Sequence, residues 1–357
     1  MLIALGIILF VLLVVVHEFG HFIVAKKSGV EVEEFGVGFP PRAKIITKKN
    51  GTEYTLNWLP IGGFVKLKGE HDSATEKGSF GAARFRQKVG IIAAGVIMNW
   101  LAAIVIFTAL SLVGMPQIIK NQFSIKSDVK VAKQEVFAGS VADDSPAKSI
   151  GVSQGDRIIS VNDTKIDSAQ QLQELTKDNA GKTVKVAYRS EGVTFTKTTK
   201  LRDDPKKGNF GVSLAEQTLL RSTWSAPIVG VGTTAQFTVE TVKGIFGAVG
   251  NLFSGQGQKA SESVTGPVGI VVILKDLANQ GFVFVLFLIG VISVSLAVMN
   301  MLPIPALDGG RLFVMLLYRL MRKPLTKETE EKIHGTGMVA LLALGLIITI
   351  VDIKRFF

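Results

Sequence analysis

The sequence predicts a polytopic α-helical membrane protein with four transmembrane helices and an inserted soluble α+β domain. Hydrophobic residues make up 47% of the 357-residue chain and charged residues only 19%, which is too apolar for an ordinary soluble protein. Four apolar segments approach or exceed the roughly 20 residues that a helical crossing needs. A long, more polar segment separates the second from the third. The predicted spans cover residues 2–25, 89–113, 282–302 and 336–353.

The first and fourth spans need separate justification. No Lys or Arg precedes the N-terminal apolar run, and no small-residue cleavage site follows it, so we interpret residues 2–25 as a span and not as a signal peptide. Lys26 and Lys27 end this span. The fully apolar core of the fourth span, from Met338 to Val351, is short for a crossing, so its bounds stay open.

Basic residues beside the spans predict the orientation of the chain. They follow the first span, precede the second and follow the third, and four spans place all of them on one side, which the positive-inside rule assigns to the cytoplasm. The segment 116–280 is then extracytoplasmic. Lys354 and Arg355 at the C-terminus disagree, but they are outnumbered. These flanks also explain the net charge of +11, so no nucleic-acid partner is expected. The flanking residues are Lys26, Lys27, Arg84, Arg86, Lys88, Arg311, Arg319, Arg322 and Lys323.

The segment 125–214 has the pattern of a small soluble domain. Residues 168–177 predict a helix with Ser168 as its N-cap. Alternating residues at 184–189 and 193–201 predict a β-hairpin. The mixture of one helix and several short strands indicates an α+β domain.

The segment 219–253 is apolar but contains Gly, Thr, Glu240 and Lys243. It is either a fifth span or one or two helices that lie on the membrane surface. We prefer the surface helices, because an odd number of spans would put the basic flanks on opposite faces. Membrane-surface amphipathic helices and a linker are therefore expected over 219–280, followed by the second part of the membrane core at 281–357.

The run HEFGH at residues 17–21 lies inside the first span. Positions i and i+4 of a helix share a face, so His17 and His21 can reach one metal ion while Glu18 serves as general base. In a soluble helix such a match is more often structural than catalytic. Two histidines and a glutamate are costly in lipid, however, and rarely occur there without a function. The pattern therefore predicts hydrolysis within the bilayer, with zinc held by His and carboxylate because the chain has no Cys.

Asp308 is the candidate for the third protein ligand of a catalytic zinc site. It lies in the run Asn300–Gly310 after the third span, where Pro303 and Pro305 interrupt the helix and two glycines allow close backbone packing. The first and third spans run in the same direction, and both halves of the site lie toward their cytoplasmic ends. The two halves can therefore meet at one depth. The alternative is that Asp308 is a helix cap or a turn residue, and its pairing with an intramembrane HExxH run weakens that alternative.

Three other polar residues are not assigned to the metal. Asn300 either hydrogen-bonds the substrate backbone or satisfies a neighbouring helix, and the sequence favours neither. His71 and His334 lie far from any ligand spacing and are interpreted as solvated loop residues.

Residues 54–67 predict a β-hairpin with its turn at Pro60–Gly63, within a cytoplasmic, membrane-associated β-loop over 35–70. This hairpin follows the first span, on the side of the candidate site. A free strand edge there could capture an unwound substrate by strand addition. From these residues alone, an ordinary cytoplasmic hairpin is favoured.

Together these residues resemble the site-2 protease (M50) family of intramembrane zinc metalloproteases, and within it the bacterial RseP-type regulators of sigma-factor proteolysis. Residues 145–158 resemble part of a PDZ domain, which identifies 125–214 as a single PDZ domain. The other matching pieces are His17–His21, Phe35–Gly38, Gly62–Leu67, Gly266–Ile270 and Asn300–Gly310.

The resemblance implies a role for each site residue. His17, His21 and Asp308 would hold one Zn²⁺ per chain, and Glu18 would be the catalytic base. It also favours strand capture over an ordinary hairpin. The substrate-binding residues would be Asn300, Gly63, Phe64, Val65, Lys66 and Leu67.

The resemblance further implies substrates, partners and location. Substrates would be single-span membrane proteins, such as anti-sigma factors, signal-peptide remnants or peptide precursors. The PDZ domain would act as a size gate that admits substrates already trimmed by an upstream site-1 protease. The protein would be a multi-pass protein of the bacterial inner or plasma membrane, with its active site toward the cytoplasmic leaflet and its PDZ domain outside. Ser295 stands where the family often has Asn, which bears on substrate handling more than on zinc binding.

Two other classes of function compete with a zinc endopeptidase. A non-catalytic membrane PDZ scaffold is the main alternative, but it would need neither Glu18 nor Asp308. A zinc transporter would need polar residues lining both leaflets, whereas the polar groups here concentrate on one side.

Overall fold

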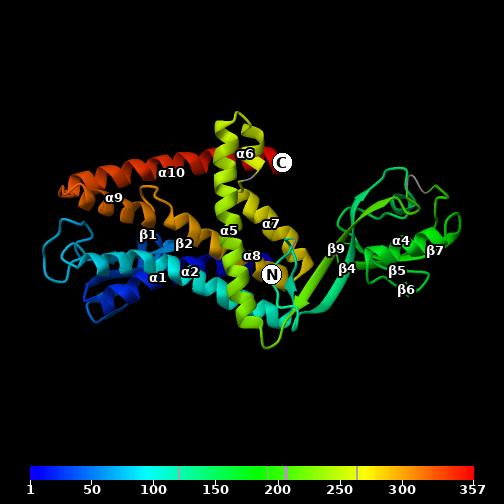
Figure 1. Ribbon diagram of the computed structural model, residues 1–357, viewed down its shortest axis with the longest axis horizontal. Coiled ribbons are helices and arrows are strands. Elements are labelled where there is room, and N and C mark those ends of the chain that lie inside the picture. The colour runs from blue at the N-terminus through cyan, green and yellow to red at the C-terminus, as the bar shows by residue number, and fades with distance from the viewer. Residues whose placement is uncertain (120, 191, 205–207, 263) are drawn as a thin grey trace. The chain divides into compact units, whose positions relative to one another are not determined.

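The computed structural model describes residues 1–357 except 120, 191, 205–207 and 263 (Figure 1). The chain divides into two compact units. The membrane unit comprises Met1–Ala109 and Pro227–Phe357, and the inserted unit comprises Leu110–Ala226. The two units are described separately below.

Four described helices are long and apolar enough to cross a membrane, as the sequence predicts. The fourth begins at Lys327 and not at 336. Thr326 caps it by accepting from the backbone N–H of Thr329, and acidic residues occupy its first turn, both of which stabilise a helix start. The helix is therefore longer than its apolar core. The four helices are α1 (Leu2–Lys27), α2 (Phe85–Val113), α8 (Phe282–Met301) and α10 (Lys327–Phe356).

The remaining helices of the membrane unit are α5 (Ala226–Phe253), α6 (Gly257–Glu262), α7 (Pro267–Gln280) and α9 (Asp308–Leu320). α7 packs against α1, α8 and α10. A Cβ added at Gly6 of α1 would come 2.6 Å from the Leu274 side chain of α7, so this glycine allows the two helices to approach closely. The last part of the expected 219–280 linker is thus a packed helix.

α5 runs across the direction of α1, α2 and α10 (Figure 1). It begins only at Ala226, after a strand, and it is not among the described helices apolar enough to cross a membrane. Phe237 of α5 stacks on Phe107 of α2 at 5.8 Å between ring centroids and meets Phe287 of α8 at 5.6 Å. These aromatic contacts hold α5 against two spans.

The β-structure between α1 and α2 differs from the predicted hairpin. β1 (Val32–Lys49) and β2 (Thr52–Leu67) meet at Asn50 and Gly51, whose φ angles are 51° and 77°. Two successive positive φ angles are what a two-residue type I′ hairpin turn requires, and Asn-Gly is its preferred sequence. The chain does reverse between Leu56 and Gly63, since both lie opposite Val37. The reversal lies inside β2 and its two arms do not pair with each other, so the predicted hairpin is wrong.

β2 flanks β1 on both sides. Phe35 lies opposite Tyr54 on one side and opposite Val65 on the other. The segments 54–57 and 63–67 are therefore separated by β1 and do not pair with each other as a hairpin. The local alternation within 54–67 could not reveal that an earlier strand is inserted between its two halves.

The inserted unit is built on a seven-stranded sheet with the order β3-β9-β4-β5-β7-β8, and β6 pairs with β5. Its buried core includes Val136, Ile158, Leu172 and Val186. Ser168 accepts from the Gln171 backbone N–H and caps α4, as predicted. The strands are β3 (Met115–Pro116), β4 (Lys130–Val141), β5 (Arg157–Val161), β6 (Thr164–Lys165), β7 (Thr183–Ser190), β8 (Val193–Lys200) and β9 (Val212–Arg221), and the helices are α3 (Pro146–Ser149) and α4 (Ala169–Asp178).

Candidate metal centre

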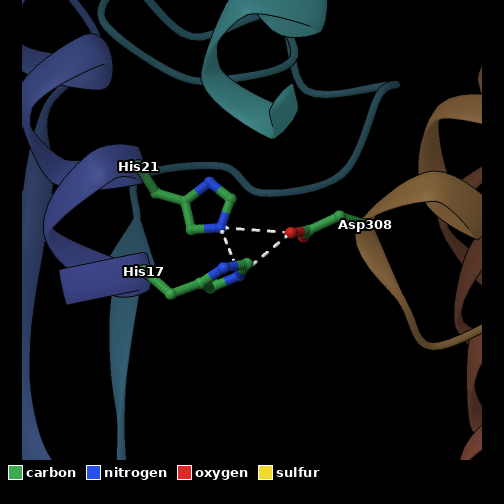
Figure 2. Close-up of side chains that lie close together, drawn as sticks. All are labelled: His17, His21 and Asp308. Carbon is green, nitrogen blue, oxygen red and sulfur yellow. Dashed lines mark hydrogen bonds and ion pairs between the residues drawn. The ribbon is translucent and has the colours of Figure 1, made fainter. Parts of the chain in front are cut away.

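Three candidate ligands from two distant segments point at one another in the membrane unit (Figure 2). His17 and His21 project from the same face of α1, because they are four residues apart on a helix. Their Nε2 atoms lie 3.2 Å apart. The Asp308 Oδ2 atom lies 3.1 Å from the Nε2 of His17 and 3.3 Å from that of His21. The two halves predicted from the sequence therefore meet.

Asp308 is positioned by the irregular backbone between α8 and α9. It is the first residue of α9, and the next two residues are glycines. A Cβ added at Gly309 would come 2.2 Å from the Met301 carbonyl oxygen, and one at Gly310 would come 1.9 Å from that of Ile304. Only glycine permits this approach, so the start of α9 is packed directly onto the preceding loop.

α10 holds the same loop through His334. The backbone N–H of Ala306 donates to the His334 Nδ1 atom at 3.0 Å, and Ala306 has a φ of 81°, which is costly for a residue other than glycine. The interpretation of His334 as a solvated loop residue is wrong, because it lies in α10 and fixes a strained part of the loop. His71 is also half-buried, with its Nε2 atom 3.4 Å from the Glu331 carboxylate.

Residues on one face of α2 contact the imidazoles of both histidines. The Nδ1 atom of His21 lies 2.7 Å from the Ile91 carbonyl oxygen, and that of His17 lies 3.3 Å from the Asn99 side-chain nitrogen. Between these two positions, a Cβ added at Gly95 would come 2.4 Å from the His21 Nε2 atom and 2.7 Å from that of His17. Because Ile91, Gly95 and Asn99 are four residues apart, they match the spacing of the two histidines on α1.

The donor set fits a tetrahedral zinc ion. Ligands about 2.0–2.1 Å from a tetrahedral ion are separated from one another by about 3.3 Å, close to the three distances of 3.1, 3.2 and 3.3 Å found here. Asp308 Oδ2 is also buried without a hydrogen bond among the described residues. A cation between the three atoms would satisfy this oxygen. The three residues leave the fourth position of a tetrahedral ion to water or substrate.

The two imidazoles control the charge of the third candidate ligand. Burial alone would raise the pKa of the Asp308 carboxyl, but the imidazoles of His17 and His21, 3.1 and 3.3 Å from its Oδ2 atom, hold that pKa well below its usual range. The group therefore stays ionised, which is the form that binds a metal.

The candidate ligands line a cavity of about 330 Å³. Glu18 and Asn300 line it as well, so the structure brings both predicted residues to the site. The predicted substrate-binding residues 63–67 of β2 alternate between lining the cavity and not lining it, as the two-residue period of a β-strand requires. Gly63, Val65 and Leu67 line the cavity, whereas Phe64 and Lys66 are not among its lining residues.

Gly95, Asn99 and Arg311 belong to the site but are not among the residues predicted for it. Asn99 and Arg311 line the cavity, and Gly95 contacts both imidazoles. A signal was present for Asn99, because a buried amide in an otherwise apolar span is costly and is rarely found without a function. The position of Arg311 after the third span indicates only a basic flank. Nothing in the local pattern distinguishes Gly95 from other glycines of the chain.

Comparison with known proteins identifies the family. The sequence profile of "Peptidase family M50" matches residues 5–344. A "Putative zinc metalloprotease" of Clostridium perfringens is 33% identical over 358 residues, which covers 99% of this chain and 98% of the relative. The "Regulator of sigma-W protease RasP" of Bacillus subtilis is 28% identical over 440 residues, which covers 98% of each chain.

Three of the solved structures found are of isolated domains. The PDZ domain of an SdrC-like protein from Listeria monocytogenes is 29% identical, with a TM-score of 0.22, and covers 24% of this chain and 93% of its own. The family assignment depends on the whole-chain matches and not on this one. By the family profile and the relatives of similar length, the chain belongs to peptidase family M50 and is a zinc metalloprotease.

Proposed function

We propose that the chain is an intramembrane endopeptidase that holds one zinc ion with His17, His21 and Asp308. The observation that carries the proposal is the triangle of two imidazole nitrogens and one carboxylate oxygen with sides of 3.1 to 3.3 Å. Two of the three atoms belong to α1, a helix long and apolar enough to cross a membrane. The hydrolytic chemistry is therefore proposed to take place below the lipid surface.

Glu18 is the proposed catalytic base. When bound, zinc activates water and polarises the scissile carbonyl. Glu18 lines the same cavity as the proposed ligands but is not one of them. Its carboxylate takes the proton of the attacking water and delivers it to the leaving amine. Asn300, which also lines the cavity, is proposed to hydrogen-bond the substrate backbone.

Strand addition is the proposed way of presenting a peptide bond to this site. A peptide bond inside a helix is shielded, so a transmembrane substrate must unwind before attack. Three alternate residues of β2, Gly63, Val65 and Leu67, line the cavity. The Glu18 side chain lies beside this edge, since a Cβ added at Gly63 would come 3.5 Å from the Glu18 Cγ atom. An unwound segment paired along this edge would therefore pass beside the proposed base.

At the Leu67 end of this strand edge, the backbone N–H already has a hydrogen-bond partner within the chain. The Leu67 backbone N–H donates to the Glu70 Oε1 atom at 2.8 Å. Strand addition is thus proposed to use the part of β2 before Leu67, with Gly63, Phe64, Val65 and Lys66 providing the backbone contacts. The side chains of Phe64 and Lys66 face away from the cavity and would tolerate substitution better than those of the alternate residues.

Cysteine cross-linking tests this edge, because the chain has no Cys of its own. We expect Lys66→Cys, combined with Glu18→Gln to stop turnover, to form disulfides with single Cys residues at alternate positions of a bound substrate. Lys48→Cys on β1 is the matched control, since its side chain is 65% exposed against 58% for Lys66. Equal cross-linking at both positions, or none at Lys66, would exclude capture by this edge.

The proposed substrates are single-span membrane proteins. The relative named as a regulator of sigma-W protease makes anti-sigma factors the first class to test, with signal-peptide remnants and peptide precursors next. We propose that the inserted unit is a PDZ domain that excludes substrates with bulky extracytoplasmic domains. An upstream site-1 protease would then have to trim them first.

Zinc removal tests the proposed function. We expect the purified protein in detergent to cleave a single-span reporter with a short extracytoplasmic tail. Stripping with a chelator should abolish cleavage, and one equivalent of Zn²⁺ should restore it. A matched reporter that carries a folded extracytoplasmic domain should be cut at least about 10-fold more slowly. Cleavage that survives complete zinc removal would contradict the proposal, and zinc binding without any cleavage would favour a scaffold.

The proposed location is the bacterial cell membrane, with the active site toward the cytoplasmic leaflet and the inserted unit outside. The basic flanks of the spans support this sidedness. α5 is proposed to lie on the outer membrane surface, since it runs across the direction of the spans (Figure 1) and exposes Ile228, Val239 and Phe246. Such a helix would bury its apolar face at the lipid boundary.

Labelling of single Cys residues in intact cells tests the sidedness. Lys27 is the last residue of α1 and Lys177 lies in α4, and both are exposed. A membrane-impermeant maleimide should label Lys177→Cys in intact cells and Lys27→Cys only after the membrane is opened. The reverse pattern would invert the proposed orientation.

A further inference from the structure

Asn99 lies where it can determine which ring nitrogen of His17 carries the proton. The Asn99 residue is 0% exposed, and its side-chain nitrogen lies 3.3 Å from the His17 Nδ1 atom. Among the described residues, the Asn99 Oδ1 atom is buried without a hydrogen-bond partner. A buried carboxamide with one end beside a histidine and the other end unsatisfied calls for a specific explanation.

Zinc binding requires the opposite orientation of this amide. The His17 Nε2 atom faces Asp308 and His21, so it must carry the lone pair that binds the metal. The ring proton of a neutral imidazole is then on Nδ1, which makes Nδ1 a donor. Its partner must be an acceptor. The oxygen of Asn99 can serve, whereas its NH₂ group cannot.

A half-turn of the Asn99 amide meets this requirement. The oxygen and nitrogen of a carboxamide exchange places with little change in shape, and their assignment follows from the hydrogen-bond network. After the half-turn, Oδ1 accepts from the Nδ1–H of His17. On the other histidine, the Ile91 carbonyl oxygen, 2.7 Å from the His21 Nδ1 atom, can act only as an acceptor. Both rings would then present Nε2 to the metal.

We propose that Asn99 is a positioning residue that accepts from His17 Nδ1–H through its side-chain oxygen and so fixes His17 as an Nε2 ligand. Together with the Ile91 carbonyl, it makes α2 the helix that orients both imidazoles of α1. The inference rests on the proposed metal site. Outer partners of this kind raise ligand basicity and fix ring orientation, and their loss typically weakens metal binding by about 10- to 100-fold.

Two substitutions of Asn99 separate the acceptor role from a packing role. Asn99→Asp keeps an acceptor of the same shape but cannot donate when ionised, and Asn99→Leu removes all hydrogen bonding at similar volume. Ser293→Ala is the matched control. The Ser293 hydroxyl donates to the Asn99 backbone oxygen at 2.7 Å, so this variant disturbs the contact of α8 with α2 without changing the partner of His17.

The readout is the zinc dissociation constant of the purified full chain, measured by competition with a chromophoric chelator. We expect Asn99→Asp and Ser293→Ala to bind zinc within about 3-fold of the wild type. Asn99→Leu should bind about 10- to 100-fold more weakly. Visible bands of the Co²⁺-loaded forms should be unchanged in Asn99→Asp and altered in Asn99→Leu.

Two results would overturn the inference. One is Asn99→Leu binding zinc as tightly as the wild type. The other is a loss of zinc affinity of 10-fold or more in Asn99→Asp, because that result would mean that Asn99 donates to His17. If Asn99→Leu does not fold, the zinc affinity of Asn99→Asp alone tests the inference. These results differ from a failure of the proposed metal site itself, because in that case the wild type would bind no stoichiometric zinc.

Discussion

Replacing Glu18 with Gln is expected to reduce reporter cleavage by about 10²- to 10⁴-fold, the range that general-base catalysis typically contributes. The amide has nearly the shape of the carboxylate but cannot take a proton from water. Glu18 lies outside the group of three residues able to hold one ion, so zinc content should stay at one per chain. Two quantities measured on the same sample check this prediction: the initial rate of reporter cleavage and the zinc content per chain.

Glu18→Asp is the control for this prediction. It retains a carboxylate on a shorter side chain, so its rate should lie between those of Glu18→Gln and the wild type. Cleavage at the wild-type rate by Glu18→Gln would remove Glu18 from the mechanism. Loss of zinc in the same variant would instead make it a ligand.

Replacing Gly95 with Ala is expected to weaken zinc binding by at least about 10-fold, even though the change adds one methyl group to an apolar helix. The added Cβ would come 2.4 Å from the His21 Nε2 atom and 2.7 Å from that of His17. These are the atoms proposed to bind the metal, so one or both rings must turn away. Outer changes that misorient ligands cost about 10- to 100-fold in affinity. Zinc titration of the purified variant measures the effect.

Gly90→Ala is the matched control on the same helix. A Cβ at Gly90 would meet Val24 at 3.8 Å, which is an ordinary contact. Alanine also favours a helix over glycine by about 1 kcal/mol, so neither variant should unfold α2. If Gly95→Ala bound zinc as tightly as Gly90→Ala, the close packing of α2 on the histidines would not matter for the metal.

The candidate ligands could be predicted from the sequence because their signals are local. His17 and His21 are four residues apart on a helix, and Asp308 lies in a Pro- and Gly-rich interruption at the end of an apolar span. Polar and ionisable side chains are energetically costly within an apolar span, so a functional site is the favoured interpretation of them. The structure brings these three residues together, as the shared direction of the first and third spans predicts.

The support around the ligands could not be predicted because it depends on contacts between distant segments. Ile91 and Asn99 lie 70 and 82 residues from the histidines that they contact, and their register is set by how α1 packs on α2. The same reason explains the error at residues 54–67, where β1 is inserted between two halves of β2. The role of His334 is also hidden in the sequence, because its partner, Ala306, lies in a loop whose strain is visible only in three dimensions.

An anomalous difference map at the zinc edge, from crystals of the full chain, would reveal whether the two distant segments hold one zinc ion. We expect a single peak per chain, about 2.0–2.2 Å from the Nε2 atoms of His17 and His21 and from a carboxylate oxygen of Asp308. No peak between these three side chains, or an ion held by other residues while the Asp308 carboxylate points elsewhere, would contradict it.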